Sequence, residues 1–396
     1  MKPARYSISR QKACRQCSVS KAKCDRAETG CSRCVQRALH CAYPRVASSH
    51  GTARPSTYST IEGGDVAAPS EPHSDPSRLT NGAAETPRRQ DGLEIRGFVD
   101  LGLVCPINAE GIANRWLGAY IPLPGLKVKE YPPITKSFLH GMLKSYVAMT
   151  VRGRGHPPFI HASQAAAHLI RPPLSACLSL VRICEHQLPG SEPAAAEVLQ
   201  REMGDLYEQC GTYDTITLLC AFQAYLMFTM VLFFRLKQIA NPFLRQAMMD
   251  LQELACASAK RGLVCEAEQQ RLRPKWESWI VAEANRRTLY TMYLFDGVLS
   301  AHDGLPTFVG IELKGLPAPA NQALWRAPAR RDWEASYNTY LADWDDGGLR
   351  IDELWRIPED FDDAEVIKRR NRVDHWLEGI DEFGTMLYAV TSNTHG

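Results

Sequence analysis

The sequence lacks the motifs that mark common enzyme active sites. It contains no G-x-S-x-G, no H-E-x-x-H and no phosphate-binding glycine loop, because Gly153-Arg154-Gly155 is followed by Pro158 where a third glycine is needed. His156, His161 and His168 are near one another in sequence, but their proline-rich spacing gives them no fixed helical register. We therefore expect a protein that is not an enzyme.

The chain also has almost no net charge and only one long apolar run. It carries 46 Lys and Arg against 44 Asp and Glu, a formal net charge of +2. Residues 1–11 are basic and lack the apolar centre of a signal peptide. We therefore expect that the protein does not enter a compartment in which disulfides form. The run from Ile216 to Phe234 could barely cross a membrane. Because no aromatic and basic anchors flank it symmetrically, we favour a central helix buried on every face and expect no membrane partner.

Cysteines, in contrast, follow an ordered pattern near the N-terminus. One half-motif occurs twice, as C-x2-C-x6-C-x6-C-x2-C-x6-C, through Cys14, Cys17, Cys24, Cys31, Cys34 and Cys41. A C-x2-C pair lets two thiolates reach one ion, and thiolate-rich tetrahedral sites select zinc. Two tetrahedral ions need eight ligand positions but six cysteines supply six, so two sulfurs must bridge. We predict a binuclear cluster with two Zn²⁺ ions, and a disulfide framework is the less favoured alternative.

The cysteine spacing and the basic run Lys21-Ala22-Lys23-Cys24-Asp25-Arg26 resemble the DNA-binding domain of fungal Zn(2)-Cys(6) binuclear zinc cluster transcription factors. The resemblance implies that Cys14 and Cys31 are the bridging ligands. It also implies which thiolates complete the two zinc sites: Cys17 and Cys24 in one, Cys34 and Cys41 in the other.

The electrostatics of this segment suit a nucleic acid. Residues 1–45 contain eleven Lys and Arg against two acidic residues, a formal charge of +9. Six thiolates and two zinc ions together add −2, which leaves about +7. A positive segment of this kind displaces counterions from a phosphate backbone. The whole chain has a formal charge of only +2, so the remaining residues carry a net negative charge. Positive charge is therefore concentrated in residues 1–45.

The resemblance also implies which residues contact DNA. It implies that Lys21 reads a G-rich triplet in the major groove, which suits an amine that can donate to guanine O6 and N7. Lys23 falls where the family contacts the DNA backbone, and Arg15 and Arg26 are further candidates on the same basic segment. The expected partner is double-stranded DNA with G/C-rich triplet half-sites. The polar stretch from Ser18 to Ser20 departs from the family's basic pattern and predicts weaker phosphate anchoring.

The next segment has a different composition. Residues 46–95 are rich in Ser, Thr, Pro, Gly and Ala, with too few large apolar side chains to offset the entropy of ordering, so we predict a disordered linker. It shows no 3.5-residue apolar repeat for a coiled coil. One zinc cluster reads only about three base pairs, too few for a unique genomic site. Specificity is therefore expected from self-association of the large domain or from a partner.

Residues 96–396 are predicted to form one large all-α regulatory domain. Apolar residues recur at three- and four-residue spacing in five stretches: Ile134 to Val151, Ser191 to Cys210, Phe243 to Gly262, Pro274 to Ser300 and Ala364 to Val390. Ser191 is expected to cap a helix and Gly262 to end one. The cysteines within these patterns have no metal-ligand spacing and are expected to pack in the core: Cys177, Cys184, Cys220 and Cys256.

The stretch around Glu283 is similar to the regulatory middle region of the same family. Glu283 can pair with Arg287 or with Arg286, and aromatic residues stripe the same predicted helix. Two further segments resemble regulators of fungal secondary-metabolite gene clusters: Asn114-Arg115-Trp116-Leu117 and Pro157-Pro158-Phe159-Ile160-His161. Packing of the fold is an equally good interpretation of these short motifs.

Residues 332–365 are strongly acidic, with twelve Asp and Glu against two Arg. Bulky side chains are interleaved with them, a composition found in activation segments that a coactivator binds. Because tryptophan is seldom left exposed, we favour a solvated acidic face whose Trp333, Trp344 and Trp355 pack inward.

These observations predict a nuclear, sequence-specific RNA polymerase II transcription factor that regulates a secondary-metabolite pathway. Its expected fold is a small binuclear zinc cluster domain at residues 1–45, joined by the linker to the all-α domain, with a coactivator or co-regulator as partner. The alternative is a zinc-scaffolded protein-interaction module without specific base readout. Retention on specific DNA that depends on Lys21 separates the two.

Overall fold

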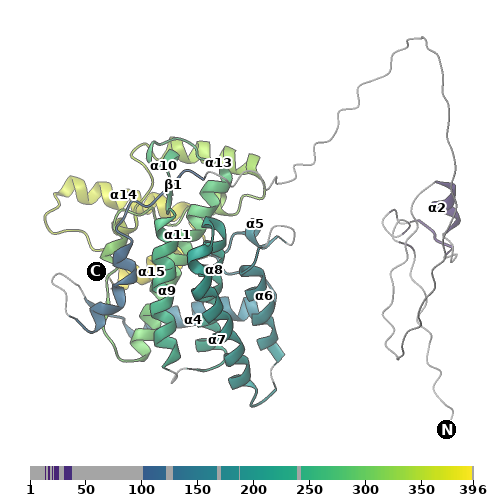
Figure 1. The fold of residues 1–396 in the computed structure, drawn as a ribbon. Coiled ribbons are helices and arrows are strands. Elements are labelled where there is room, and N and C mark those ends of the chain that lie inside the picture. The colour runs from purple at the N-terminus through teal and green to yellow at the C-terminus, as the bar shows by residue number, and fades with distance from the viewer. Residues whose placement is uncertain are drawn as a thin grey trace, which may run out of the picture. The chain divides into compact units, whose positions relative to one another are not determined.

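A computed structural model describes residues 14, 17, 20, 22–25, 31–37, 101–121, 128–166, 171–186, 188–238 and 242–394. The chain divides into two compact units, residues 1–88 and 89–396. Figure 1 shows the second unit as a bundle of packed helices. The segment predicted as a linker, 46–95, lies outside the described residues.

The described part of the first unit is small. Its α-helix α2 spans Ser32–Gln36 and begins directly after Cys31, the N-cap. Cys14, Cys17, Cys31 and Cys34 have almost no exposed surface and form a core made of thiols alone. Among the described residues of this unit, a core of cysteines offers little apolar burial, so metal ligation is expected to supply the stability.

The second unit is largely helical, as the sequence predicts. Its short helices are α3 (Glu110–Ala113), η2 (Arg115–Ala119), α5 (Ala162–Ala165), η3 (Cys184–His186), η4 (Cys210–Thr212), α10 (Glu266–Gln269), η5 (Ile311–Leu313), α12 (Gln322–Trp325) and η6 (Ile351–Leu354). The longer helices are α4 (Pro133–Val151), α6 (Leu174–Ile183), α7 (Glu192–Gln209), α8 (Thr215–Phe234), α9 (Phe243–Lys260), α11 (Trp276–His302), α13 (Arg330–Asp343), α14 (Asp363–Gly379) and α15 (Glu382–Thr394).

Helices α8 and α11 form the centre of this bundle, where α9 runs alongside both (Figure 1). Helix α8 is the one described helix long and apolar enough to cross a membrane, yet 89% of its most apolar window is buried. It packs against α4, α6, α7, α9 and α11. Because apolar neighbours cover it on all sides, α8 has the surroundings of a central helix in a globular domain, as its charge-free sequence predicts.

Two short antiparallel ribbons tie distant segments to this bundle. β1 (Leu103–Val104) pairs with β3 (Val264–Cys265), and β2 (Val128–Lys129) pairs with β4 (Thr307–Phe308). Gly262 precedes β3 at a φ of 127°, and a Cβ there would lie 2.3 Å from the Leu103 Cβ. Glycine is therefore required both to end α9 and to let the ribbon approach.

The structure confirms one local prediction in position and refines another. Ser191 occupies the N-cap position of α7 but makes no side-chain cap, because its hydroxyl donates to the Leu188 carbonyl at 2.8 Å. The stretch Ala364–Val390, whose helical apolar spacing runs without interruption, forms two helices, α14 and α15, with a break at Ile380 and Asp381. The Asp381 carboxylate accepts from the Gly384 amide at 3.0 Å, which starts the new helix.

The cysteines predicted to pack in the core of the bundle do so. Cys177, Cys184, Cys220 and Cys256 are all buried, and the Cys177 thiol donates to the Ala224 carbonyl. Burial raises the pKa of Cys220 to about 12, so this thiol stays neutral. A neutral, enclosed thiol behaves as a small apolar side chain.

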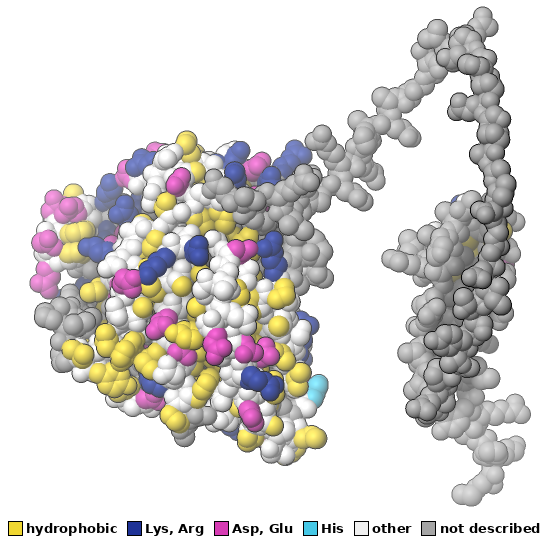
Figure 2. All heavy atoms as spheres, viewed as in Figure 1, with side chains coloured by type: hydrophobic (Ala, Val, Ile, Leu, Met, Phe, Trp, Pro, Cys, Tyr) yellow, Lys and Arg dark blue, Asp and Glu magenta, His cyan; other side chains and the backbone are white. Residues whose placement is uncertain are grey.

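The acidic segment 332–365 is folded onto the bundle. Trp333 is 1% exposed, whereas Trp344 and Trp355 are half-buried and pack against the main core. In Figure 2 acidic side chains gather at the edge where Figure 1 labels α14. The arrangement agrees with the prediction of an acidic face whose tryptophans pack inward.

Candidate metal centre

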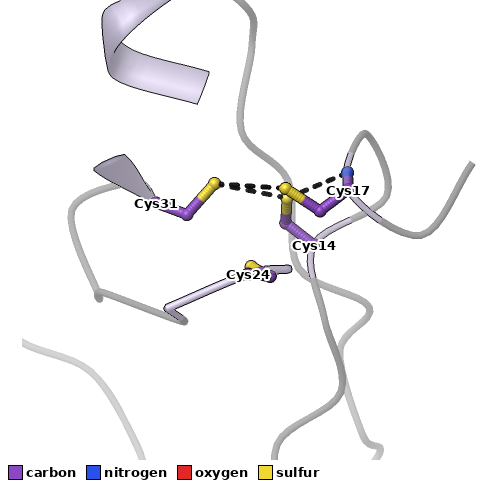
Figure 3. Close-up of side chains that lie close together, drawn as sticks. All are labelled: Cys14, Cys17, Cys24 and Cys31. Carbon is purple, nitrogen blue, oxygen red and sulfur yellow. Dashed lines mark hydrogen bonds between the residues drawn. The ribbon is translucent and has the colours of Figure 1, made fainter. Parts of the chain in front are cut away.

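Four predicted zinc ligands come together in the first unit. The Sγ atoms of Cys14, Cys17, Cys24 and Cys31 all lie within 4.8 Å of one another. Figure 3 shows their side chains converging from separate stretches of the chain. The Sγ atoms of Cys14 and Cys31 are 3.7 Å apart, and those of Cys17 and Cys31 are 3.6 Å apart.

These distances fit a tetrahedral zinc ion. A zinc–sulfur bond of about 2.3 Å gives a sulfur–sulfur edge of about 3.8 Å in a regular tetrahedron. A disulfide would instead hold two sulfurs about 2.05 Å apart, and all the described cysteines are free thiols. The four thiols are therefore suited to hold one Zn²⁺ as thiolates, and four such ligands leave no open position for a water or substrate.

A fifth thiol connects this group to the second half-motif. The Cys34 Sγ lies 3.8 Å from the Cys14 Sγ, again close to a tetrahedral edge. Cys14 thus contacts Cys31 and also Cys34, which is the position that a bridging sulfur requires. Cys41, the sixth predicted ligand, lies outside the described residues.

Polar side chains that sequence reasoning counted only as charges support the thiol group. The Asp25 carboxylate accepts two bonds of 3.1 Å from the Ser32 amide and a further bond from the Ser32 hydroxyl. It thereby satisfies a free amide at the start of α2, directly beside Cys31. In the sequence, the only indication of this contact is that Asp25 follows the third cysteine and Ser32 follows the fourth.

Arg33 makes a second link between the half-motifs. Its Nη1 atom lies 3.9 Å from the Cys17 Sγ and donates to the Ser20 hydroxyl at 2.7 Å. A guanidinium beside a thiolate offsets part of the negative charge that six thiolates and two Zn²⁺ leave on the cluster. The structure thus gives Arg33 a supporting role that the motif did not indicate.

Of the predicted DNA contacts, the structure describes one. Lys23 lies in the first half-motif, directly before Cys24, with its side chain exposed, where it is accessible to a phosphate. Lys21, Arg15 and Arg26 lie outside the described residues.

The helical unit contains buried charges that are paired. Glu283 binds both predicted partners at 2.7 Å, Arg286 through Oε2 and Arg287 through Oε1. Arg287 continues to Asp381 at 2.6 Å, and the Glu283, Arg287 and Asp381 side chains are at most 1% exposed. This network joins α11 to the start of α15. The charged residues of α11 therefore have a structural role.

A second buried ionic group involves the motif Asn114-Arg115-Trp116-Leu117. Arg115 bonds to Asp296 at 3.2 Å and to Glu312 at 3.1 Å, so it attaches η2 to α11 and η5. Lys129 is also buried nearby, and burial, reinforced by the Arg115 charge, lowers its pKa to about 7. The structure thus gives Arg115 the packing role that the sequence left open.

Residues 12–49 match the family model of the fungal Zn(2)-Cys(6) binuclear cluster domain. The chain therefore carries a cluster domain of this family, whose cofactor is two zinc ions. The match supports a DNA-binding transcription factor. No curated protein and no solved structure matches the chain.

Proposed function

We propose that this protein is a nuclear, sequence-specific transcription factor that acts on RNA polymerase II promoters of a secondary-metabolite gene cluster. The observation that carries the DNA-binding part is the convergence of four thiols at tetrahedral distances within a matched Zn(2)-Cys(6) domain. The narrower pathway assignment is supported by the two short segments that resemble such regulators, residues 114–117 and 157–161.

In this proposal the cluster domain binds double-stranded DNA at G/C-rich triplet half-sites. Lys21 reads the guanines. Lys23 binds a phosphate, and Arg15 and Arg26 bind phosphates or other DNA groups near the half-site. The formal charge of +9 on residues 1–45 supports an electrostatic attraction to DNA. A saturated all-thiolate cluster supports a structural and not a catalytic role for the metal, in keeping with a protein that is not an enzyme.

A single cluster specifies too few base pairs, so the proposal includes a second source of specificity. Self-association through the helical unit would pair two half-sites, and their spacing would then be set by the dimer. A coactivator or co-regulator would bind the exposed acidic side chains of residues 332–365. The accessible acids of this segment support such a partner, since they include Asp332, Asp343 and Glu359.

Selection from a random DNA pool tests this function directly. The full-length, zinc-loaded protein should enrich G/C-rich triplets, and prior treatment with a chelator should remove the enrichment because the cluster domain depends on metal to fold. Cys31→Ser should behave like the chelated protein, and Cys105→Ser, outside the cluster, should behave like the parent. Enrichment that persists in Cys31→Ser would contradict the proposal.

A further inference from the structure

One cavity in the helical unit has the size and lining of a small-molecule site. It has a volume of about 480 Å³ and lies where α4, α8 and α11 meet. Its apolar walls include Leu139, Phe233, Val298 and Ala301. Pockets that enclose small ligands span about 300 to 1,000 Å³ and are mostly apolar with a few placed polar groups.

One residue that lines the cavity carries such a polar group. Tyr131 lines it, and the Tyr131 hydroxyl is buried without a hydrogen-bond partner among the described protein atoms. The ring lies against α11 at Gly297, where a Cβ would come within 2.6 Å of the hydroxyl oxygen. Burial raises the pKa of Tyr131 to about 12, so the hydroxyl keeps its proton and remains a donor. A buried donor without an acceptor is costly, and an acceptor on a bound ligand would remove that cost.

The rim of the cavity carries one lysine and two histidines. Lys136, His140 and His302 line it; burial, together with the nearby Lys144 and His302 charges, lowers the pKa of His140, so this imidazole stays neutral near pH 7 and Lys136 supplies the fixed positive charge. Two acidic residues lie near the cavity, and both are already paired. Asp303 bonds to Arg245 and contacts His302, and Asp296, near Tyr131, bonds to Arg115. An anionic group at the rim would therefore meet positive charge, and a cationic group would be repelled.

We propose that this cavity binds a small amphipathic carboxylate, with its apolar body among α4, α8 and α11 and its carboxylate at the basic rim. The Tyr131 hydroxyl donates to an oxygen of the same carboxylate. Binding here would link the ligand to the packing of α8 against α11, the centre of the helical unit. This inference concerns the helical unit alone and does not depend on how the zinc cluster reads DNA.

Fluorescence displacement on the full-length protein tests the proposal. Anilinonaphthalene sulfonate, an apolar anion, serves as the reporter, and decanoate and decyltrimethylammonium compete with matched apolar chains. Decanoate should displace the reporter saturably and at lower concentration than the cation. Equal displacement by both competitors, or no saturable displacement by decanoate, would overturn the proposal.

Three variants place the ligand in the cavity. Ala301→Phe fills the apolar space and should abolish displacement by decanoate, whereas Ala335→Phe, at an exposed position of α13, should not. Tyr131→Phe should weaken decanoate by about two- to tenfold without lowering the unfolding temperature, because the hydroxyl has no protein partner to lose. Decanoate binding unchanged by both Ala301→Phe and Tyr131→Phe would overturn the assignment.

The rim charge has its own matched control. Lys136→Glu should weaken decanoate by about two- to fivefold and leave decyltrimethylammonium unaffected or improved. Lys314→Glu makes the same charge change at an exposed residue that does not line the cavity. Equal effects of the two substitutions on decanoate would show a general charge effect and contradict the basic rim as the carboxylate site.

Discussion

The Sγ atoms of Cys14 and Cys31 lie 3.7 Å apart, although the two residues begin separate half-motifs. Their distance is close to the edge of a zinc-centred tetrahedron, and each also lies near a further thiol, Cys34 for Cys14 and Cys17 for Cys31. The two half-motifs are therefore joined through this pair.

Replacing a bridging cysteine should remove more bound zinc than replacing a terminal one. We expect two Zn²⁺ per parent chain by elemental analysis, nearly complete loss in Cys14→Ser or Cys31→Ser, and partial loss in Cys41→Ser, because a bridging thiolate binds both ions. Cys105→Ser is the control for a thiol outside the cluster. One zinc per parent chain, or equal losses in the three cluster variants, would contradict the bridged arrangement.

The Asp25 carboxylate should stabilise the cluster through α2. Asp25→Ala leaves the Ser32 amide without its acceptor, and a lost cap costs about 1 kcal/mol. We expect zinc affinity, measured by chelator competition, to fall by about tenfold. Asp332→Ala, which removes the same charge from an exposed site in the helical unit, should leave zinc affinity unchanged. If both variants retain the parent affinity, Asp25 has no supporting role.

The ion pair between Arg287 and Asp381 should be essential to the helical unit. Asp381→Ala leaves a buried guanidinium without one of its two carboxylates, and breaking a buried pair costs about 3 to 5 kcal/mol. Urea unfolding should show this loss. Glu359→Ala, which breaks the exposed pair with Arg356, should cost at most about 0.5 kcal/mol. A loss in Asp381→Ala as small as in Glu359→Ala would be inconsistent with this buried network.

Lys129 should make the stability of the helical unit depend on pH. Its pKa is lowered to about 7 by burial, so the unfolded chain binds a proton on this amine at pH 8 to 10 whereas the folded chain mostly does not. Stability contributed by this site therefore rises with pH across that window. Lys129→Met should be more stable than the parent at pH 7, and the difference should shrink toward pH 10. The measurement is urea unfolding of both proteins at pH 7 and pH 10. The same difference in unfolding free energy at the two pH values would rule out this titration.

The thiol group and the helical character of the second unit could be predicted from sequence because both depend on short, repeated spacings. The break between α14 and α15 could not, since apolar spacing continues through Ile380 while Asp381 is bound by Arg287, far away in sequence. The cap made by Asp25 and the burial of Lys129 were missed for the same reason. Each depends on a contact that only the fold brings together.

The most direct measurement compares matched G-rich and scrambled DNA sites, using fluorescence anisotropy of the full-length protein at several salt concentrations. Lys21→Ala should lose about 1 to 3 kcal/mol on the matched site and only the effect of one charge on the scrambled site. Lys23→Ala should weaken both sites alike and make the salt slope shallower by about one unit, as expected for a phosphate contact. Equal losses on both sites for Lys21→Ala would contradict base readout and favour a zinc-scaffolded interaction module.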